Sequence, residues 1–226
     1  MIEYKTPPEY FLELHFPRSR FNTELEDTLL LLASKMVQLG VTSKDEFKEE
    51  INNYLRSLHD GNPKEKTIDN HRTEMTSLYG LAKQIDDEVI VGNRTFLLVK
   101  TQDIPRFFKS ICNKFQFPNG INKIQFIEHY VAEGVRFKPA QYLINLLRAG
   151  KELTGKTFAV TAKEVAQLVF NDRRVTVGQE KPNERIRLFL ELRDKNILCD
   201  GTGDVIRYAR DFLNFMTAAN LLIEFD

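Results

Sequence analysis

The chain has 226 residues, no formal net charge, 42% hydrophobic residues and 28% charged residues. This length can bury one large core or two small ones, and the composition is that of an ordinary soluble globular protein. The zero charge excludes a protein held to nucleic acid by its overall charge. A single basic face stays compatible with nucleic-acid binding, because the field at one face matters more than the sum.

The two cysteines, Cys112 and Cys199, lie far apart in the sequence and in apolar surroundings. With no signal peptide and no apolar run long enough to span a bilayer, they indicate buried free thiols in a reducing cytoplasm. A zinc site would need clustered Cys or His ligands, and the four histidines are scattered. We therefore expect no metal site and no membrane segment.

The first 22 residues are interpreted as an N-terminal arm, because their prolines disfavour a helix. Two interpretations of the arm stay open. In one, an extended apolar segment packs on the body of the protein. In the other, Arg18 and Arg20 reach a DNA groove, as basic arms beside helix-turn-helix units do. The apolar residues of the first interpretation are Phe11, Leu12, Leu14 and Phe16.

Residues 23–100 begin with two predicted helices. The stretch 25–39 has apolar residues at helical spacing, and Ser43 is expected to cap the next helix, with Glu46 completing a capping box. Residues 46–48 match the D/E-x-K tripeptide of metal-dependent nucleases. A nuclease needs that tripeptide on a strand beside a second carboxylate, whereas this one falls on a helix. No phosphate-binding loop, HExxH motif or Ser/His/Asp set is present either, so no catalytic residue is predicted.

The stretch 66–99 is the one around which the other elements are organised. Thr67 is expected to cap a third helix, with Asn70 at its N3 position. Residues 89–91 and 95–99 are expected to form two strands joined by a hairpin turn at Gly92-Asn93. A helix followed by a hairpin is typical of a winged helix-turn-helix, in which the start of the helix enters the DNA major groove.

The start of this third helix carries side chains that can read bases. Asn70 suits adenine and Arg72 suits guanine, whereas Asp69 can accept from cytosine and Thr73 can meet a thymine methyl or a phosphate. The alternative is a solvated helical face on which Asp69 pairs with Arg72 at i, i+3. Lysines at the mouth of the helix suit phosphate contacts. The predicted DNA-binding residues here are Lys64, Lys66, Thr67, Asp69, Asn70, Arg72 and Thr73.

Residues 101–136 are expected to form a helical linker subdomain, and 137–226 a second winged-helix subdomain. In the linker, a helix should bury Ile124, Ile127 and Val131. In the second subdomain, Thr161 and Glu164 form a predicted capping box, and Asp204 should cap the last helix. Early in that helix lie three further candidate DNA contacts, whose alternative is a charged outer face: Arg207, Tyr208 and Arg210.

The last residues, 221–225, read as the first strand of a second wing that has no partner strand in the sequence. An unpaired apolar strand is rare at the end of a natural domain. We therefore expect that the wing is truncated, either because the chain is a piece of a longer protein or because another part of the fold supplies the missing edge.

Residues 67–74 and 107–120 resemble the N-terminal recognition domain of the BpuJI family of Type IIS restriction endonucleases. The resemblance implies a mainly α (α+β) fold with two winged helix-turn-helix subdomains joined by a helical linker subdomain. It also implies that both helix-turn-helix units and the arm read an asymmetric site on double-stranded DNA in the major groove. A separate C-terminal domain would dimerise and cut with Mg²⁺. The recognition domain itself would be monomeric, cytoplasmic (prokaryotic) and without a cofactor.

The resemblance is weakest in the second subdomain. Arg207 and Tyr208 fall where the family is expected to have different polar residues, which implies a different target base. Two alternatives stay open. A stand-alone winged-helix transcriptional regulator would usually bind a palindrome as a symmetric dimer. A protein-interaction winged helix without DNA contacts would fit the neutral charge.

Overall fold

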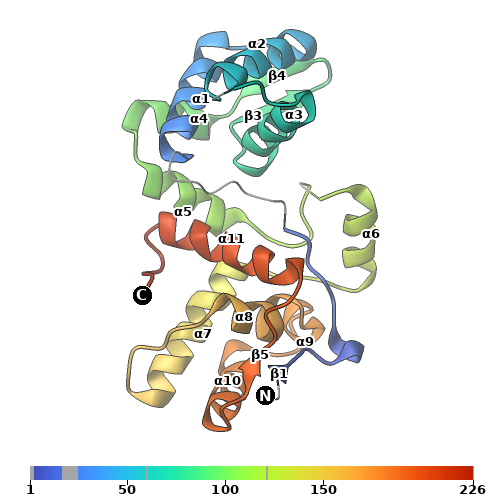
Figure 1. Cartoon of the computed structure of the whole chain (residues 1–226), viewed down its shortest axis with the longest axis vertical. Helices are drawn as coiled ribbons and strands as arrows, with labels where there is room; N and C mark the ends of the chain where they lie inside the picture. The colour runs from blue at the N-terminus through green and yellow to red at the C-terminus, as the bar shows by residue number, and fades with distance from the viewer. Residues whose placement is uncertain (1–2, 17–24, 60, 121, 226) are drawn as a thin grey trace. The chain divides into compact units, whose positions relative to one another are not determined.

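The computed structural model describes residues 3–16, 25–59, 61–120 and 122–225. The chain divides into two compact units. Unit 1 comprises Met1–Phe16 and Phe108–Asp226, and unit 2 comprises Pro17–Phe107. The described residues are mainly helical with short strands, which confirms the predicted class at this level (Figure 1). The finer division into an arm, two winged subdomains and a linker stays a prediction.

Unit 2 combines helices with a small antiparallel sheet in which β4 lies between β2 and β3. In this sheet Thr42 faces Val89, and Ala82 faces Val91. Helix α1 packs on α2 and α4, and α2 packs on α3. The described elements in order are α1 (Leu25–Leu39), β2 (Thr42–Ser43), α2 (Lys44–Ser57), α3 (Glu65–Thr73), the π-helical turn η2 (Glu74–Leu78), β3 (Ala82–Ile85), β4 (Glu88–Val91) and α4 (Asn93–Thr101).

The hairpin lies earlier in the chain than the sequence predicted. Asp86 and Asp87 join β3 to β4, and Asp86 adopts a left-handed φ of 53°. Gly92 has a φ of −78° and begins α4 as its N-cap, so the predicted Gly92-Asn93 turn is wrong. The predicted strand 95–99 is helical as well, because α4 packs on α1 and buries Thr95 and Leu98.

The third helix also begins earlier than predicted. Lys64 is its N-cap, and Thr67 lies in its first turn, where its backbone N–H donates to the Lys64 carbonyl at 2.8 Å. Ser43 does cap α2, since its hydroxyl accepts from the Glu46 backbone N–H at 3.3 Å. The reciprocal bond of a capping box is missing from the described contacts of α2.

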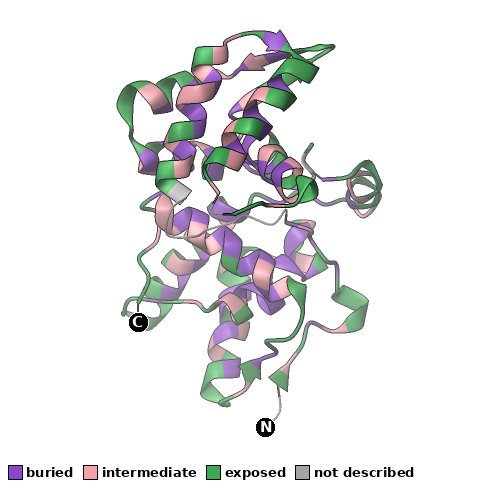
Figure 2. Cartoon of the chain, turned by 45° about the horizontal axis from the view of Figure 1, so that its top comes forward, coloured by how far each residue is buried: buried purple, intermediate pink, exposed green. Residues whose placement is uncertain are grey.

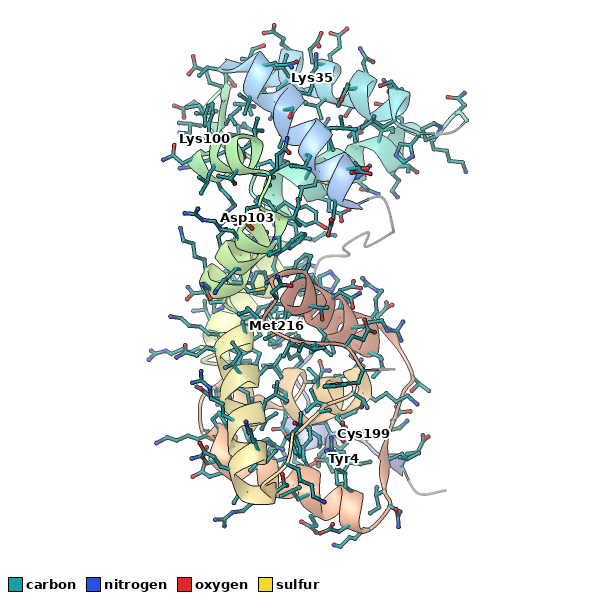
Figure 3. The ribbon with its side chains drawn as sticks, turned by 90° about the vertical axis from the view of Figure 1, so that its left-hand side faces the viewer. Tyr4, Lys35, Lys100, Asp103, Cys199 and Met216 are labelled. Atoms are coloured by element: carbon teal, nitrogen blue, oxygen red, sulfur yellow. The ribbon has the colours of Figure 1, made fainter. Side chains whose placement is uncertain are left out.

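Unit 1 is built around α11, which packs on α8 and η3, while α7 and α10 pack side by side. Strands β1 and β5 pair in parallel, so that Tyr4 lies beside Cys199 (Figure 3). The described elements are β1 (Glu3–Tyr4), η1 (Pro8–Tyr10), the later part of α5 (Ile104–Lys114), α6 (Ile124–Ala132), α7 (Pro139–Thr154), α8 (Ala162–Val165), the π-helical turn η3 (Ala166–Phe170), α9 (Arg173–Thr176), α10 (Pro182–Asp194), β5 (Leu198–Cys199) and α11 (Asp204–Ala218).

The N-terminal segment of unit 1 contributes to its core (Figure 2). Leu12, Leu14 and Phe16 are buried, whereas Phe11 is exposed. The Phe16 ring packs against the rings of Phe115, Phe212 and Phe215, with centroids 5.2–5.6 Å apart. The packed interpretation is therefore confirmed for Leu12, Leu14 and Phe16 but not for Phe11. Arg18 and Arg20 lie outside the described residues.

Three details of unit 1 differ from the prediction. Helix α6 turns its expected core face outward, with Ile124 68% and Val131 63% exposed. Gly203, not Asp204, is the N-cap of α11. Residues 221–225 form no strand. By contrast, the capping box of Thr161 and Glu164 at the start of α8 is confirmed.

Both cysteines are buried free thiols, as predicted. None of the described helices is long and apolar enough to cross a bilayer. Among the residues that the structure describes, His, Cys, Asp and Glu side chains nowhere gather into a group that would hold a metal ion.

Candidate nucleic-acid interface

Helix α3 presents an exposed polar stripe on one side. Lys66, Asn70 and Thr73 are exposed and lie at positions i, i+4 and i+7, and Ser77 in η2 continues the line. The Thr73 hydroxyl donates to the Asp69 carbonyl at 2.8 Å, so its proton is already used in a hydrogen bond within the helix. Within the described residues, the Asn70 amide makes no protein hydrogen bond. Asn70 is therefore free to bind a partner with two hydrogen bonds.

Asp69 and Arg72 are held by a buried amide on the neighbouring helix. Asn52 of α2 is 3% exposed. Its Nδ2 donates to Asp69 Oδ1 at 3.1 Å, and its Oδ1 accepts from Arg72 Nη1 at 3.0 Å. Arg72 Nη1 also lies 3.1 Å from Asp69 Oδ1. Of the two sequence interpretations for this pair, the i, i+3 ion pair is the one that the structure contains.

The pKa of Asp69 reflects this arrangement. The hydrogen bond from Asn52 is the largest cause that lowers it, followed among the lowering causes by the charge of Arg72. Asn52 also donates to Glu65 at 3.2 Å, and Glu65 forms an ion pair with Arg56. The buried amide thus joins α2 to the first turns of α3 and sets the direction of the Arg72 guanidinium.

Sequence reasoning missed Asn52 altogether. Its backbone lies on the core side of α2, next to Ile51 and one turn before Leu55 and Arg56. A polar residue on the buried side of an otherwise amphipathic helix is the signal that would have found it, because a buried amide requires partners.

The other predicted residues of this region differ in exposure. Lys64 is exposed at the start of α3, and Thr67 is half-buried in its first turn. His71 is 8% exposed, with Nδ1 3.4 Å from Nε2 of His59, which follows the end of α2. The positive charge at the mouth of α3 therefore comes from Lys64 and Lys66.

The tip of the β3–β4 hairpin is acidic. Asp86, Asp87 and Glu88 are all exposed there. Like charges repel, so this tip does not suit contact with a phosphate backbone. Any polyanion that meets unit 2 would be attracted to the start of α3 and repelled at the hairpin tip.

The three candidates in unit 1 have different environments. Tyr208 is 3% exposed, and its hydroxyl lies 2.7 Å from Nδ1 of His15. The Arg207 guanidinium stacks on the Tyr208 ring at 4.5 Å and pairs with Asp204 and Asp211 at 3.5 and 3.6 Å. Arg210 is exposed. Of these three, Tyr208 is in the core, and Arg210 is the side chain most open to a partner.

Burial also governs the titration of this cluster. It raises the pKa of Tyr208 and lowers that of His15. The His15 ring stacks on Phe126 at 5.0 Å, and the His15 backbone N–H donates to the Tyr130 hydroxyl at 2.7 Å. The cluster thus fastens the N-terminal segment to α6 and α11 and has a structural role.

Two comparisons with known proteins agree on one relationship. A search of solved structures finds a structure described as "Crystal structure of pyrene- and phenanthrene-modified DNA in complex with the BpuJ1 endonuclease binding domain". The match has a TM-score of 0.89 and 28% identity, and it covers 97% of this chain and 80% of that one. Curated proteins give no match. The sequence model of the family "Restriction endonuclease BpuJI - N terminal" matches residues 4–226. The chain therefore belongs to the BpuJI restriction endonuclease N-terminal family.

Proposed function

We propose that this chain is the sequence-specific recognition domain of a modular, Type IIS-like restriction endonuclease and binds double-stranded DNA. The family membership supports this proposal, as does the 28% identity to a binding domain solved with DNA. Cleavage belongs in the proposal to a separate C-terminal domain that binds Mg²⁺ and dimerises, while the recognition domain is a monomer in a prokaryotic cytoplasm.

Unit 2 acts in this proposal as a winged helix-turn-helix. The order α1-β2-α2-α3-β3-β4 and the central place of β4 in the sheet support that assignment. Helix α3 then takes the place of the recognition helix, whose first turns enter the major groove. The observation that carries the proposal is the exposed stripe of Lys66, Asn70 and Thr73 on those turns.

The residues of α3 divide into three roles in this proposal. Asn70 reads a base through two hydrogen bonds, and the methyl group of Thr73 meets a thymine methyl. Lys64 and Lys66 contact phosphates, which position the protein without specifying a sequence. Arg72 reaches a guanine only in the direction that Asn52 and Asp69 allow. Thr67, half-buried in the first turn, offers its side-chain hydroxyl to a phosphate.

Two further surfaces complete the asymmetric site in this proposal. Unit 1 contributes a second helix-turn-helix, in which Arg210 and the exposed part of Arg207 face DNA and Tyr208 supports Arg207 from below. The N-terminal arm adds Arg18 and Arg20. Because these surfaces differ in residue type from α3, the site read by the whole domain is expected not to be a palindrome.

A selection from randomised duplexes tests the proposal, followed by affinity measurements at several salt concentrations. We expect one asymmetric sequence to be enriched. Lys66→Ala should weaken binding to all duplexes alike and reduce the salt slope by about 1, the contribution of one phosphate contact. Enrichment of a palindrome would favour a dimeric regulator, and no enrichment at all would overturn the proposal.

A further inference from the structure

Unit 1 contains a cavity of about 490 Å³ that the recognition surfaces do not use. Segments 116–118, 135–145 and 175–182 contribute its walls. This volume lies in the usual range of small-molecule sites, about 300–1,000 Å³. It is large enough to hold a ring system together with a charged group.

The rim of the cavity is positively charged. Arg136, Lys138 and Lys181 line it and are exposed. In the described ranges none of the three forms an ion pair with a carboxylate. Glu180 is the acidic residue of the lining, and it is already paired with the buried Arg185. The cations therefore carry an uncompensated charge that suits an anion.

The first turn of α7 adds to this field. Lys138 is its N-cap and Pro139 its first residue, and no side chain caps the helix. The N–H groups of a first helical turn have no partner within the helix and carry a partial positive charge. Pro139 has no N–H and Ala140 does not line the cavity, so Gln141 is the residue of this turn whose N–H would meet a phosphate beside Lys138.

The interior of the cavity is aromatic and polar in turn. Phe117 and Phe137 are buried, and the half-buried Tyr142 ring lies 5.7 Å from that of Phe137 at 60°. Gln141 and Asn145 on α7 are exposed and line the same cavity. A nucleobase is planar and carries hydrogen-bond donors and acceptors. It therefore suits a site with aromatic rings to pack against and amides that donate and accept hydrogen bonds.

Backbone hydrogen bonds hold the walls together. Phe117 and Phe137 exchange two of them, at 2.8 and 3.1 Å. The Arg136 N–H donates to the Thr176 carbonyl at 2.9 Å, and the Tyr142 hydroxyl donates to the Glu180 carbonyl at 3.4 Å. The three wall segments are thus fixed relative to one another, so a ligand would find the cavity already formed.

We propose that this cavity binds one nucleoside monophosphate unit, with the phosphate at the Arg136, Lys138 and Lys181 rim and the base against Tyr142 and the amides. Two sources of this chemistry exist: a free nucleotide, or an unpaired nucleotide within a DNA strand. The proposal does not depend on the reading of DNA by α3, because it uses neither that helix nor its hairpin.

Calorimetric titration with dAMP, deoxyadenosine and inorganic phosphate tests the chemistry. A parallel titration with a duplex containing one unpaired nucleotide, set against its fully paired form, tests the source. We expect dAMP, or the duplex with the unpaired nucleotide in preference to the paired one, to bind. If each rim cation contributes about threefold as an exposed charge, the triple variant Arg136→Ala, Lys138→Ala, Lys181→Ala should bind at least about tenfold more weakly.

The matched control removes the same charge away from the cavity. Arg148, Lys151 and Lys156 are exposed and do not line it. The triple variant Arg148→Ala, Lys151→Ala, Lys156→Ala should retain binding, and circular dichroism checks that both variants fold. A loss of equal size in the control would overturn the proposal, as would phosphate binding as tightly as dAMP. Binding of neither probe would overturn it as well, while paired-duplex binding through α3 would be unaffected.

Discussion

The substitution Asn52→Ala tests the organisation of the recognition helix. Asn52 is 3% exposed and bonds to Asp69, Arg72 and Glu65. A hydrogen bond to a charged group contributes about 1.5–3 kcal/mol. In the variant, Asp69 and Arg72 remain paired with each other and reach water. The loss of stability should therefore be close to the contribution of one such bond, not of three. We expect the free energy of unfolding to fall by about 2 kcal/mol, the size of one bond of this kind.

Urea denaturation measures this change, and the neighbouring residue supplies the control. Asn53 is exposed on the same helix, so Asn53→Ala should change stability by less than about 0.5 kcal/mol, as is usual for surface sites. The variant Asn52→Ala should also raise the pKa of Asp69 toward its ordinary value, because the amide is the main cause of its lowering. The difference in stability between this variant and the unmodified protein should then shrink as the pH falls through the lowered pKa of Asp69. Equal stability of the two alanine variants would mean that the buried amide of Asn52 does not stabilise the protein.

Three further predictions concern unit 1 and the thiols. Gly150→Ala should destabilise the protein by about 1–3 kcal/mol through overpacking, because the added Cβ would lie 2.3 Å from Cγ of Phe158. The control Gly120→Ala has open space around its added Cβ and should leave stability unchanged. Thermal melts measure both variants. Burial lowers the pKa of His15 below 6.5. The free energy of unfolding should therefore decrease as the pH falls from 6.5 through the lowered pKa. The variant His15→Gln should not show this decrease when denaturation curves at pH 7.5 and pH 5 are compared. Burial raises the pKa of both cysteines to about 12, so a disulfide reagent at pH 8 should label them in urea but not in the native protein.

The helices were predictable because their signals are local. Ser43 and Thr161 cap helices as expected, and apolar spacing identified α1. The strand at residues 88–91 was also recognised through its β-branched run. Such signals involve residues within one or two turns of each other, which a sequence displays directly.

The hairpin was misplaced because tertiary packing overrides local propensity. Strand β3 is mostly exposed and polar, without the alternation that marks a half-buried strand. Residues 95–99 have β-branched character but form α4, because a helix lets Thr95 and Leu98 pack on α1. Neither fact is visible without the position of α1.

The candidate interface was partly predictable. Residue type alone identified Asn70 and Thr73 as candidates, whereas the bonds of Asn52 to Asp69 and Arg72 span 17 and 20 residues. The burial of Tyr208 was predictable from the sequence. Tyr208 precedes the buried Phe212 by four residues, which puts it on the core side of α11.

The base preference of the variant Asn70→Ala shows whether the exposed side of α3 reads bases. The measurement is the affinity of this variant for the selected duplex and for every single-base change in it, with Asn53→Ala as control. We expect a loss in binding free energy of about 1–3 kcal/mol that is confined to one base pair, where discrimination between bases disappears. A loss of equal size on every duplex, or no loss at all, would mean that Asn70 does not read a base.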